Sequence, residues 1–207
     1  MKLLGSRTSG DDDFFSDWDF YIDSAADFDR IYKLLDRALV WRLQYQGESN
    51  MLTVVGPKGE IFKFSGPRNQ FKHMWERIQY SRTHEDLHHY WILAFQQLKV
   101  LYREYDLLAE IGLERLSGLM RDIYLKRAAD VAEYKSTFSY REMRLKVADC
   151  QEKISVVTGL PYRTAGERLH KIREMNALIQ TISPDEFFSM ANIFEVRTKW
   201  LAEQAVV

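Results

Sequence analysis

Cysteine, proline and glycine are scarce in this chain of 207 residues, which has one cysteine, four prolines and ten glycines. The single cysteine, Cys150, excludes an internal disulfide and a zinc site built from cysteines. The few prolines and glycines argue against long loops. No apolar run approaches the roughly 18 residues that a membrane helix needs, and the first residues do not resemble a signal peptide. We therefore expect a cytoplasmic protein that does not enter a membrane.

Neither sign of charge is in excess, because 29 basic residues face 30 acidic residues and the formal net charge is -1. This balance argues against a dedicated nucleic-acid binder, which usually carries a basic excess. Hydrophobic residues make up 46% of the chain and charged residues 29%, as in an ordinary globular protein. The chain therefore has enough apolar residues to form a core, and intrinsic disorder is excluded.

Glycine is unevenly distributed, with six of the ten glycines in the first 66 residues. Turn signals there separate five short segments with strand-like patterns, at 2–5, 17–22, 41–45, 51–55 and 60–64, and a helical pattern at 24–39. The remaining residues carry helical start and stop signals. The sequence therefore predicts an α+β fold, in which a small mixed β-sheet domain (1–66) precedes a C-terminal helical bundle (67–207).

Start signals for the helices of the second part lie at Pro67, Thr83, Ser139, Thr164 and Ser183. The first of these helices should run to about Ser81, and the second should pass through Tyr105 and stop near Gly112. The third should end before Gly159, where Gly-Leu-Pro is a stop signal.

Two aspartates, Asp17 and Asp19, lie two residues apart on a predicted strand, so both carboxylates should face the same way. Two hard oxygen ligands on one face suit Mg²⁺, which typically takes one or two carboxylates together with phosphate oxygens. Gly5 and Ser6 end the preceding strand, where a glycine lets a phosphate approach the backbone and a hydroxyl can donate to it. The sequence predicts a phosphate-binding turn beside a metal site, and binding of a nucleoside triphosphate requires both.

The series Leu4-Gly5-Ser6, a gap of ten residues, and then Asp17-Trp18-Asp19-Phe20 resembles the signature of the polymerase-beta-type nucleotidyltransferase superfamily. The spacing is that of the minimal nucleotidyltransferases and their antibiotic-modifying relatives, and Arg7, Gly10 and Ser16 also match. The resemblance implies that a nucleoside monophosphate moves from ATP or another nucleoside triphosphate, with Mg²⁺, to an acceptor hydroxyl. The acceptor would be a small molecule or a tyrosine of a partner protein.

The same resemblance assigns roles to the residues of the motif. Asp17 and Asp19 would hold the metal, while Gly5, Ser6 and Arg7 would hold the triphosphate.

The second part of the chain resembles the C-terminal bundle of aminoglycoside and lincosamide nucleotidyltransferases. The likeness lies in Tyr90-Trp91, Lys99 and Tyr102-Arg103-Glu104, which are similar to the helix on the substrate side of those enzymes. The resemblance implies a general base from this part. Glu104 is the first candidate, with Glu76 and Glu85 as substitutes.

One position departs from the family pattern, because Lys63 stands where a third carboxylate is expected on a later strand and Glu60 lies at the mouth of that strand. Two alternatives follow. The ammonium of Lys63 neutralises the charge of a triphosphate, or it forms a salt bridge with Asp17 or Asp19, which would make a pseudoenzyme. The second function class is therefore a degenerate nucleotidyltransferase-fold protein that binds a nucleotide or a partner protein, as an antitoxin does.

Two rival patterns carry less weight. His84, Glu85 and His88 match the His-Glu-x-x-His motif of zinc proteases, but they lie at a predicted helix start rather than inside a helix. A polar helix start near the cleft explains them better. Arg163 and His170 have the loose spacing of helical ribonuclease modules, which chance produces easily in a chain with 29 basic residues.

Overall fold

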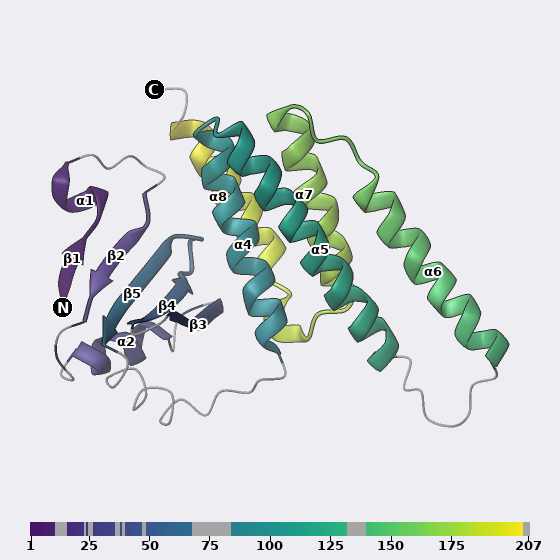
Figure 1. Ribbon diagram of the computed structural model, residues 1–207, viewed down its shortest axis with the longest axis horizontal. Helices are drawn as coiled ribbons and strands as arrows, with labels where there is room; N and C mark the ends of the chain where they lie inside the picture. Colours follow the sequence, from purple (N-terminus) through teal and green to yellow (C-terminus); the bar gives the residue numbers. More distant parts are fainter. Residues whose placement is uncertain are drawn as a thin grey trace.

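The computed structural model describes residues 1–10, 16–22, 24, 27–35, 38, 40–46, 49–67, 84–131 and 140–204. A five-stranded sheet with its helices forms the sheet part (1–67), and a set of long helices beside it forms the helical part (84–204), as Figure 1 shows. The predicted α+β class, with a small mixed sheet followed by a helical bundle, is confirmed. No helix in the described ranges is long and apolar enough to cross a membrane.

The sheet part consists of β1 (Lys2–Leu4), α1 (Ser6–Ser9), β2 (Trp18–Tyr21), α2 (Phe28–Leu35), β3 (Val40–Gln46), β4 (Ser49–Val55) and β5 (Ile61–Pro67). The helical part consists of α4 (Glu85–Tyr102), α5 (Asp106–Val131), α6 (Tyr140–Thr158), α7 (Ala165–Gln180), the short 3₁₀ helix η3 (Asp185–Phe187) and α8 (Met190–Gln204). In Figure 1, α4 and α8 lie nearest the sheet and α6 lies farthest from it.

The strand order is β1-β2-β5-β4-β3, and only β2 and β5 pair in parallel. The register places Asp19 of β2 between Leu4 of β1 and Lys63 of β5. The parallel pairing thus brings the aspartate motif beside the position where the family pattern expects a third carboxylate.

The sheet has a small core of its own. Helix α2 is strongly amphipathic, and its apolar side chains cover one face of the sheet. The buried members of this core are Ile22, Phe28, Ile31, Leu52, Val54 and Phe64. This packing holds β2 and β5 in place, and with them the residues at their ends.

Helix α4 lies at the centre of the larger core. It contacts α5, α7 and α8 as well as β3 and β4. Its fully buried side chains include Leu87, Tyr90, Trp91 and Leu98. Because Val40, Val55 and Ile61 belong to the same cluster, the sheet part and the helical part share this core.

The prediction of a single helix from Thr83 to Gly112 was wrong about where the helix ends, because two helices occupy this range. α4 stops at Tyr102 and α5 starts at Asp106, with Glu104 between them at φ 56°, in the left-handed region that few residues other than glycine adopt. Gly112 lies inside α5 and not at a stop. A Cβ there would lie 2.0 Å from Nε2 of Gln97, so this glycine allows the close approach of α4 and α5.

The capping box predicted at Thr164 and Glu167 is present at the start of α7, with both hydrogen bonds formed. The signal at Ser183 is different, because only the short η3 follows it and α8 begins at Met190. The Ser183 hydroxyl donates to the carbonyl of Ile179 at 2.8 Å, so it closes the preceding helix instead.

Two other predicted helix starts have different outcomes. Pro67 is the last residue of β5 and not the start of a helix; proline is tolerated there because it stands at the end of a strand. The rest of the predicted helix, and the capping residue Ser139, lie outside the described residues. α6 nevertheless ends before Gly159, as predicted.

Candidate functional site

A cleft of about 500 Å³ lies where the sheet part meets α4 and α8. Its walls come from four stretches of the chain that are distant in sequence: α1 with the start of β2, the turn before β5, the second half of α4, and the last turns of α8. The lining residues are Arg7, Ser16, Asp17, Trp18, Lys58, Gly59, Glu60, Ile61, Phe95, Lys99, Val196, Arg197, Trp200 and Leu201.

Asp17 is held by two lysines at the wall of this cleft. Its side chain is only 4% exposed, and its Oδ2 accepts from Nζ of Lys63 at 2.6 Å and from Nζ of Lys99 at 2.8 Å. Of the alternatives that the sequence left open for Lys63, the structure therefore has the salt bridge, and it is made to Asp17. The sequence placed Lys99 on the helix that resembles the substrate side of the family, but it did not predict the contact with Asp17.

Asp19 lies two residues after Asp17, inside β2, opposite Lys63 in the sheet and beside Gly5. Its Oδ2 would be 2.9 Å from a Cβ at position 5, and Gly5 has φ 74° and ψ -160°. Such a backbone conformation is essentially restricted to glycine. In this structure Gly5 therefore makes room for the Asp19 carboxylate, and neither Gly5 nor Ser6 lines the cleft.

Ser16 joins three elements just before β2. Its hydroxyl accepts from Ser6 Oγ at 3.0 Å and from Nη2 of Arg103 at 3.1 Å, and its carbonyl accepts from Nη2 of Arg7 at 2.9 Å. The residue is 7% exposed. The motif residues Ser6 and Arg7 thus fix the segment that carries Asp17, together with an arginine from the end of α4 that the sequence did not assign to the site.

The cleft carries an excess of positive charge. Its described lining has four basic side chains, from Arg7, Lys58, Lys99 and Arg197, against the two carboxylates of Asp17 and Glu60. Burial lowers the pKa of Arg197, and nearby Glu60 acts in the opposite direction. A concave surface with a net positive lining attracts anions and concentrates them.

Aromatic rings accompany the charges. The Arg7 guanidinium lies 4.0 Å from the ring centre of Trp18, and that of Arg197 lies 4.3 Å from the ring centre of Trp200. Both indoles are about one-third exposed, at 36% and 37%. Arginine and tryptophan faces of this kind are platforms on which planar bases stack. The cleft therefore suits an anion that carries a planar group.

Two of the three candidates for a general base, Glu104 and Glu85, lie away from the cleft. Glu104 is exposed in the link between α4 and α5, and it is not part of the lining. Glu85 is the first residue of α4, about 21 Å along the helix from Lys99 at 1.5 Å per residue. Glu76 lies outside the described residues.

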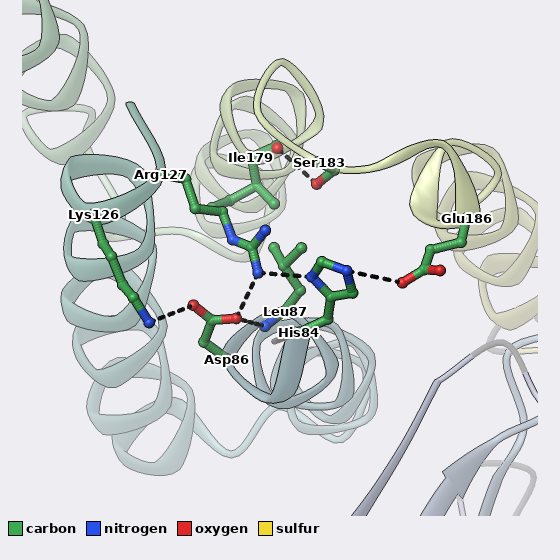
Figure 2. A network of polar contacts seen from close by, with 8 residues as sticks. All are labelled: His84, Asp86, Leu87, Lys126, Arg127, Ile179, Ser183 and Glu186. Carbon is green, nitrogen blue, oxygen red and sulfur yellow. Dashed lines mark hydrogen bonds and ion pairs between the residues drawn. The ribbon is translucent and has the colours of Figure 1, made fainter. Parts of the chain in front are cut away.

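The two histidines of the His-Glu-x-x-His pattern have structural partners. As Figure 2 shows, His84 lies between Arg127, at 3.2 Å from its Nδ1, and Glu186, at 3.6 Å from its Nε2. Nδ1 of His88 accepts the main-chain N–H of Trp41 at 3.2 Å. These contacts connect α4 with α5, η3 and β3, which is a packing role.

The described site does not fit Mg²⁺ in this arrangement. The charge of Asp17 is balanced by two ammonium groups on one of its oxygens, and their positive charge opposes the binding of a divalent cation beside them. Within the described ranges, no group of three or more His, Cys, Asp or Glu side chains is placed to hold a metal ion. The two lysines supply positive charge where the resemblance implies a metal.

Comparison with known proteins finds a likeness among solved structures. No family model and no curated protein matches the chain. Among solved structures, the chain is similar to an aminoglycoside 6-adenyltransferase from Bacillus subtilis, with 12% identity and a TM-score of 0.41 over 92% of this chain and 89% of the other. Because the identity and the TM-score are both low, we base the proposed function on the side chains of the cleft.

Proposed function

We propose that this chain binds a nucleoside triphosphate in the cleft and holds the polyphosphate with its own basic side chains rather than through a metal ion. The observation that carries the proposal is the pair of ammonium groups on Asp17, at 2.6 and 2.8 Å, where Asp17 forms part of the wall of a cleft whose lining has twice as many basic as acidic side chains. Phosphate oxygens accept charge-assisted hydrogen bonds from lysine and arginine.

Each part of the nucleotide has a matching part of the cleft. Lys99 and Arg197 would contact phosphate oxygens from the helical part, and Arg7 would do so from the sheet part. The exposed faces of Trp18 and Trp200 would receive the base. Lys63 is not part of the lining, so its role would be to hold Asp17 while Lys99 turns toward the ligand.

The second candidate is the transfer reaction that the motif implies, with a small hydroxyl compound or a partner protein as the acceptor. The retained pair Asp17 and Asp19 at the start of β2 favours it. The two ammonium groups on Asp17 oppose it, as does the position of Glu104 outside the cleft lining. Binding of a triphosphate is therefore better supported than transfer of a nucleotide.

Calorimetric titration with ATP, GTP, CTP and UTP separates the two candidates when each titration is done once with EDTA and once with Mg²⁺. We expect at least one triphosphate to bind in EDTA with an affinity close to that in Mg²⁺. Absence of binding under both conditions would contradict the proposal. Binding that strictly requires Mg²⁺ would favour the transfer reaction, which labelled triphosphate and a cell lysate would then test.

A matched pair of variants locates the binding. Lys99→Met removes one cation from the lining while Lys63 still pairs with Asp17, and it should weaken triphosphate binding about tenfold to a hundredfold, the effect of one hydrogen bond to a charged group. Lys126→Met removes an exposed lysine of α5 that is not part of the cleft lining, and it should leave binding unchanged. Equal affinities of the two variants would place the nucleotide elsewhere.

A further inference from the structure

A second hollow lies on the other side of α8, where a groove of about 740 Å³ runs between α7, the segment around η3 and the first turns of α8. The α8 residues at positions 191, 192 and 195 line this groove, while those at 196, 197, 200 and 201 line the cleft. With 3.6 residues per turn, these two sets lie on opposite sides of the helix. The groove is therefore separate from the site of the proposed function.

The wall of the groove contains a buried amide whose nitrogen has no hydrogen-bond partner among the described residues. Asn176 is 2% exposed, and its Nδ2 has no hydrogen-bond partner in the described part of the chain. Its Oδ1 accepts from the Tyr90 hydroxyl at 2.8 Å. Burial raises the pKa of Tyr90 well above its usual value, so the phenol keeps the proton that it donates to Oδ1. The nitrogen is left to donate to a ligand.

Two hydroxyl oxygens on the same wall can accept hydrogen bonds from a ligand. Thr181 Oγ1 donates to the carbonyl of Leu178 at 2.7 Å, and Ser183 Oγ donates to the carbonyl of Ile179 at 2.8 Å. The second of these contacts is drawn in Figure 2. Since both hydroxyl protons are in use, the two oxygens offer lone pairs to a ligand. A ligand that meets Asn176 and these hydroxyls must both accept and donate, as a hydroxyl group does.

The charges of the groove cancel within the lining. Arg173 and Glu195 form a two-pronged ion pair, with Nε to Oε1 at 2.8 Å, Nε to Oε2 at 3.0 Å and Nη2 to Oε2 at 2.6 Å. They are the only charged members of the described lining, so it has no net charge. Phe188 also belongs to the lining and is 51% exposed, which offers a flat apolar surface to a ligand.

From these features we infer that the groove binds a neutral, hydroxyl-rich molecule of the size of a monosaccharide. Its hydroxyl groups accept from Asn176 and donate to Thr181 and Ser183, and its apolar face lies on the ring of Phe188. The volume of the groove is in the range of small-molecule sites.

The test is a titration of the full chain with D-glucose and with N-acetyl-D-glucosamine, followed by saturation-transfer NMR. For a ligand with so few atoms we expect saturable binding with a dissociation constant of about 1 mM. Saturating ATP should not change it, because the cleft lies on the other side of α8. No saturable binding of either sugar up to about 50 mM overturns the inference.

Variants decide whether binding occurs in the groove. Ala177→Leu places a larger side chain in the lining at an exposed helix position and should weaken binding at least about tenfold. The matched control, Ala165→Leu, makes the same exchange at an exposed position of α7 outside the groove and should have no effect. Asn176→Asp keeps an oxygen for Tyr90 but loses the N–H donors, and it should weaken binding by a similar factor. Sugar binding that is unaffected by Ala177→Leu overturns the inference.

Discussion

The sheet part and the helical part of this protein are stabilised internally by different kinds of contact. Inside the sheet part, main-chain ladders and a small apolar core fix the positions of β2 and β5. Inside the helical part, a large apolar core surrounds α4. Where the two parts meet at the cleft, they share an apolar cluster that includes Ile61 and Phe95, and polar contacts are added to it: Lys99 with Asp17, and Arg103 with Ser16. The cleft therefore depends on docking of the two parts as well as on the folding of each.

The largest effect is expected when both lysines on Asp17 are removed. The double variant Lys63→Met, Lys99→Met leaves a carboxylate that is 4% exposed without its two ammonium partners, and it should lower the free energy of unfolding by about 3–5 kcal/mol. Urea denaturation measures this change. Adding Asp17→Asn to the double variant removes the buried charge and should restore most of the loss. If the triple variant is no more stable than the double variant, the charge of Asp17 is not what the lysines balance.

His88, which joins α4 to β3, should make the stability of the protein depend on pH. Burial, and next the nearby His84, lower the pKa of His88 from 6.5 to about 4, while Asp86 acts in the opposite direction. The unfolded chain therefore binds more protons between these values. The resulting stabilisation is complete above about pH 6.5 and is lost as the pH falls toward 4, by at most about 3 kcal/mol.

The measurement is the free energy of unfolding at several values between pH 4 and 7. His88→Gln keeps an acceptor for the main-chain N–H of Trp41 but does not titrate, so the stability of this variant should fall less than that of the native protein as the pH drops. His170→Gln, at an exposed position of α7, is the matched control and should keep the native pH dependence. Identical curves for all three proteins would contradict the role assigned to His88.

Two glycines of the sheet part allow a smaller and more local test. Gly5→Ala meets Asp19 Oδ2 at 2.9 Å in a backbone conformation reserved for glycine, and it should reduce stability by about 2 kcal/mol or more. Gly10→Ala also has a positive φ, of 78°, but a Cβ there meets nothing within 4 Å, so it should lose only about 1 kcal/mol. Thermal unfolding of both variants checks the difference. Equal losses would mean that Asp19 does not pack against Gly5.

The smallest effect is expected inside α5, where two glycines again differ in their surroundings. Gly118→Ala meets nothing within 4 Å and should stabilise the protein by about 0.5–1 kcal/mol, because alanine favours the helix. Gly112→Ala has the same helical benefit but must displace the buried side chain of Gln97, so it should be less stable than Gly118→Ala. The opposite order would show that α4 and α5 can separate slightly without loss.

The sequence by itself determined the local features of the protein. The α+β class, the helix pattern of α2, the capping box of α7 and the stop of α6 before Gly159 all depend on residues within a few positions of one another. Such signals can be recognised in one sequence, because the backbone responds to near neighbours.

Only the tertiary structure decided which groups from distant parts of the chain meet. Lys99 and Arg103 reach the aspartate motif from more than 80 positions away, and Arg197 lies still farther along the chain. Gly112 is typical of a helix stop in the sequence, but the approach of Gln97 gives it a packing role inside a helix. Long-range contacts of this kind depend on how preformed elements dock, and no local pattern encodes them. For the same reason the family motif predicted two metal-binding carboxylates, whereas the docked helices supply a second lysine that balances one of them.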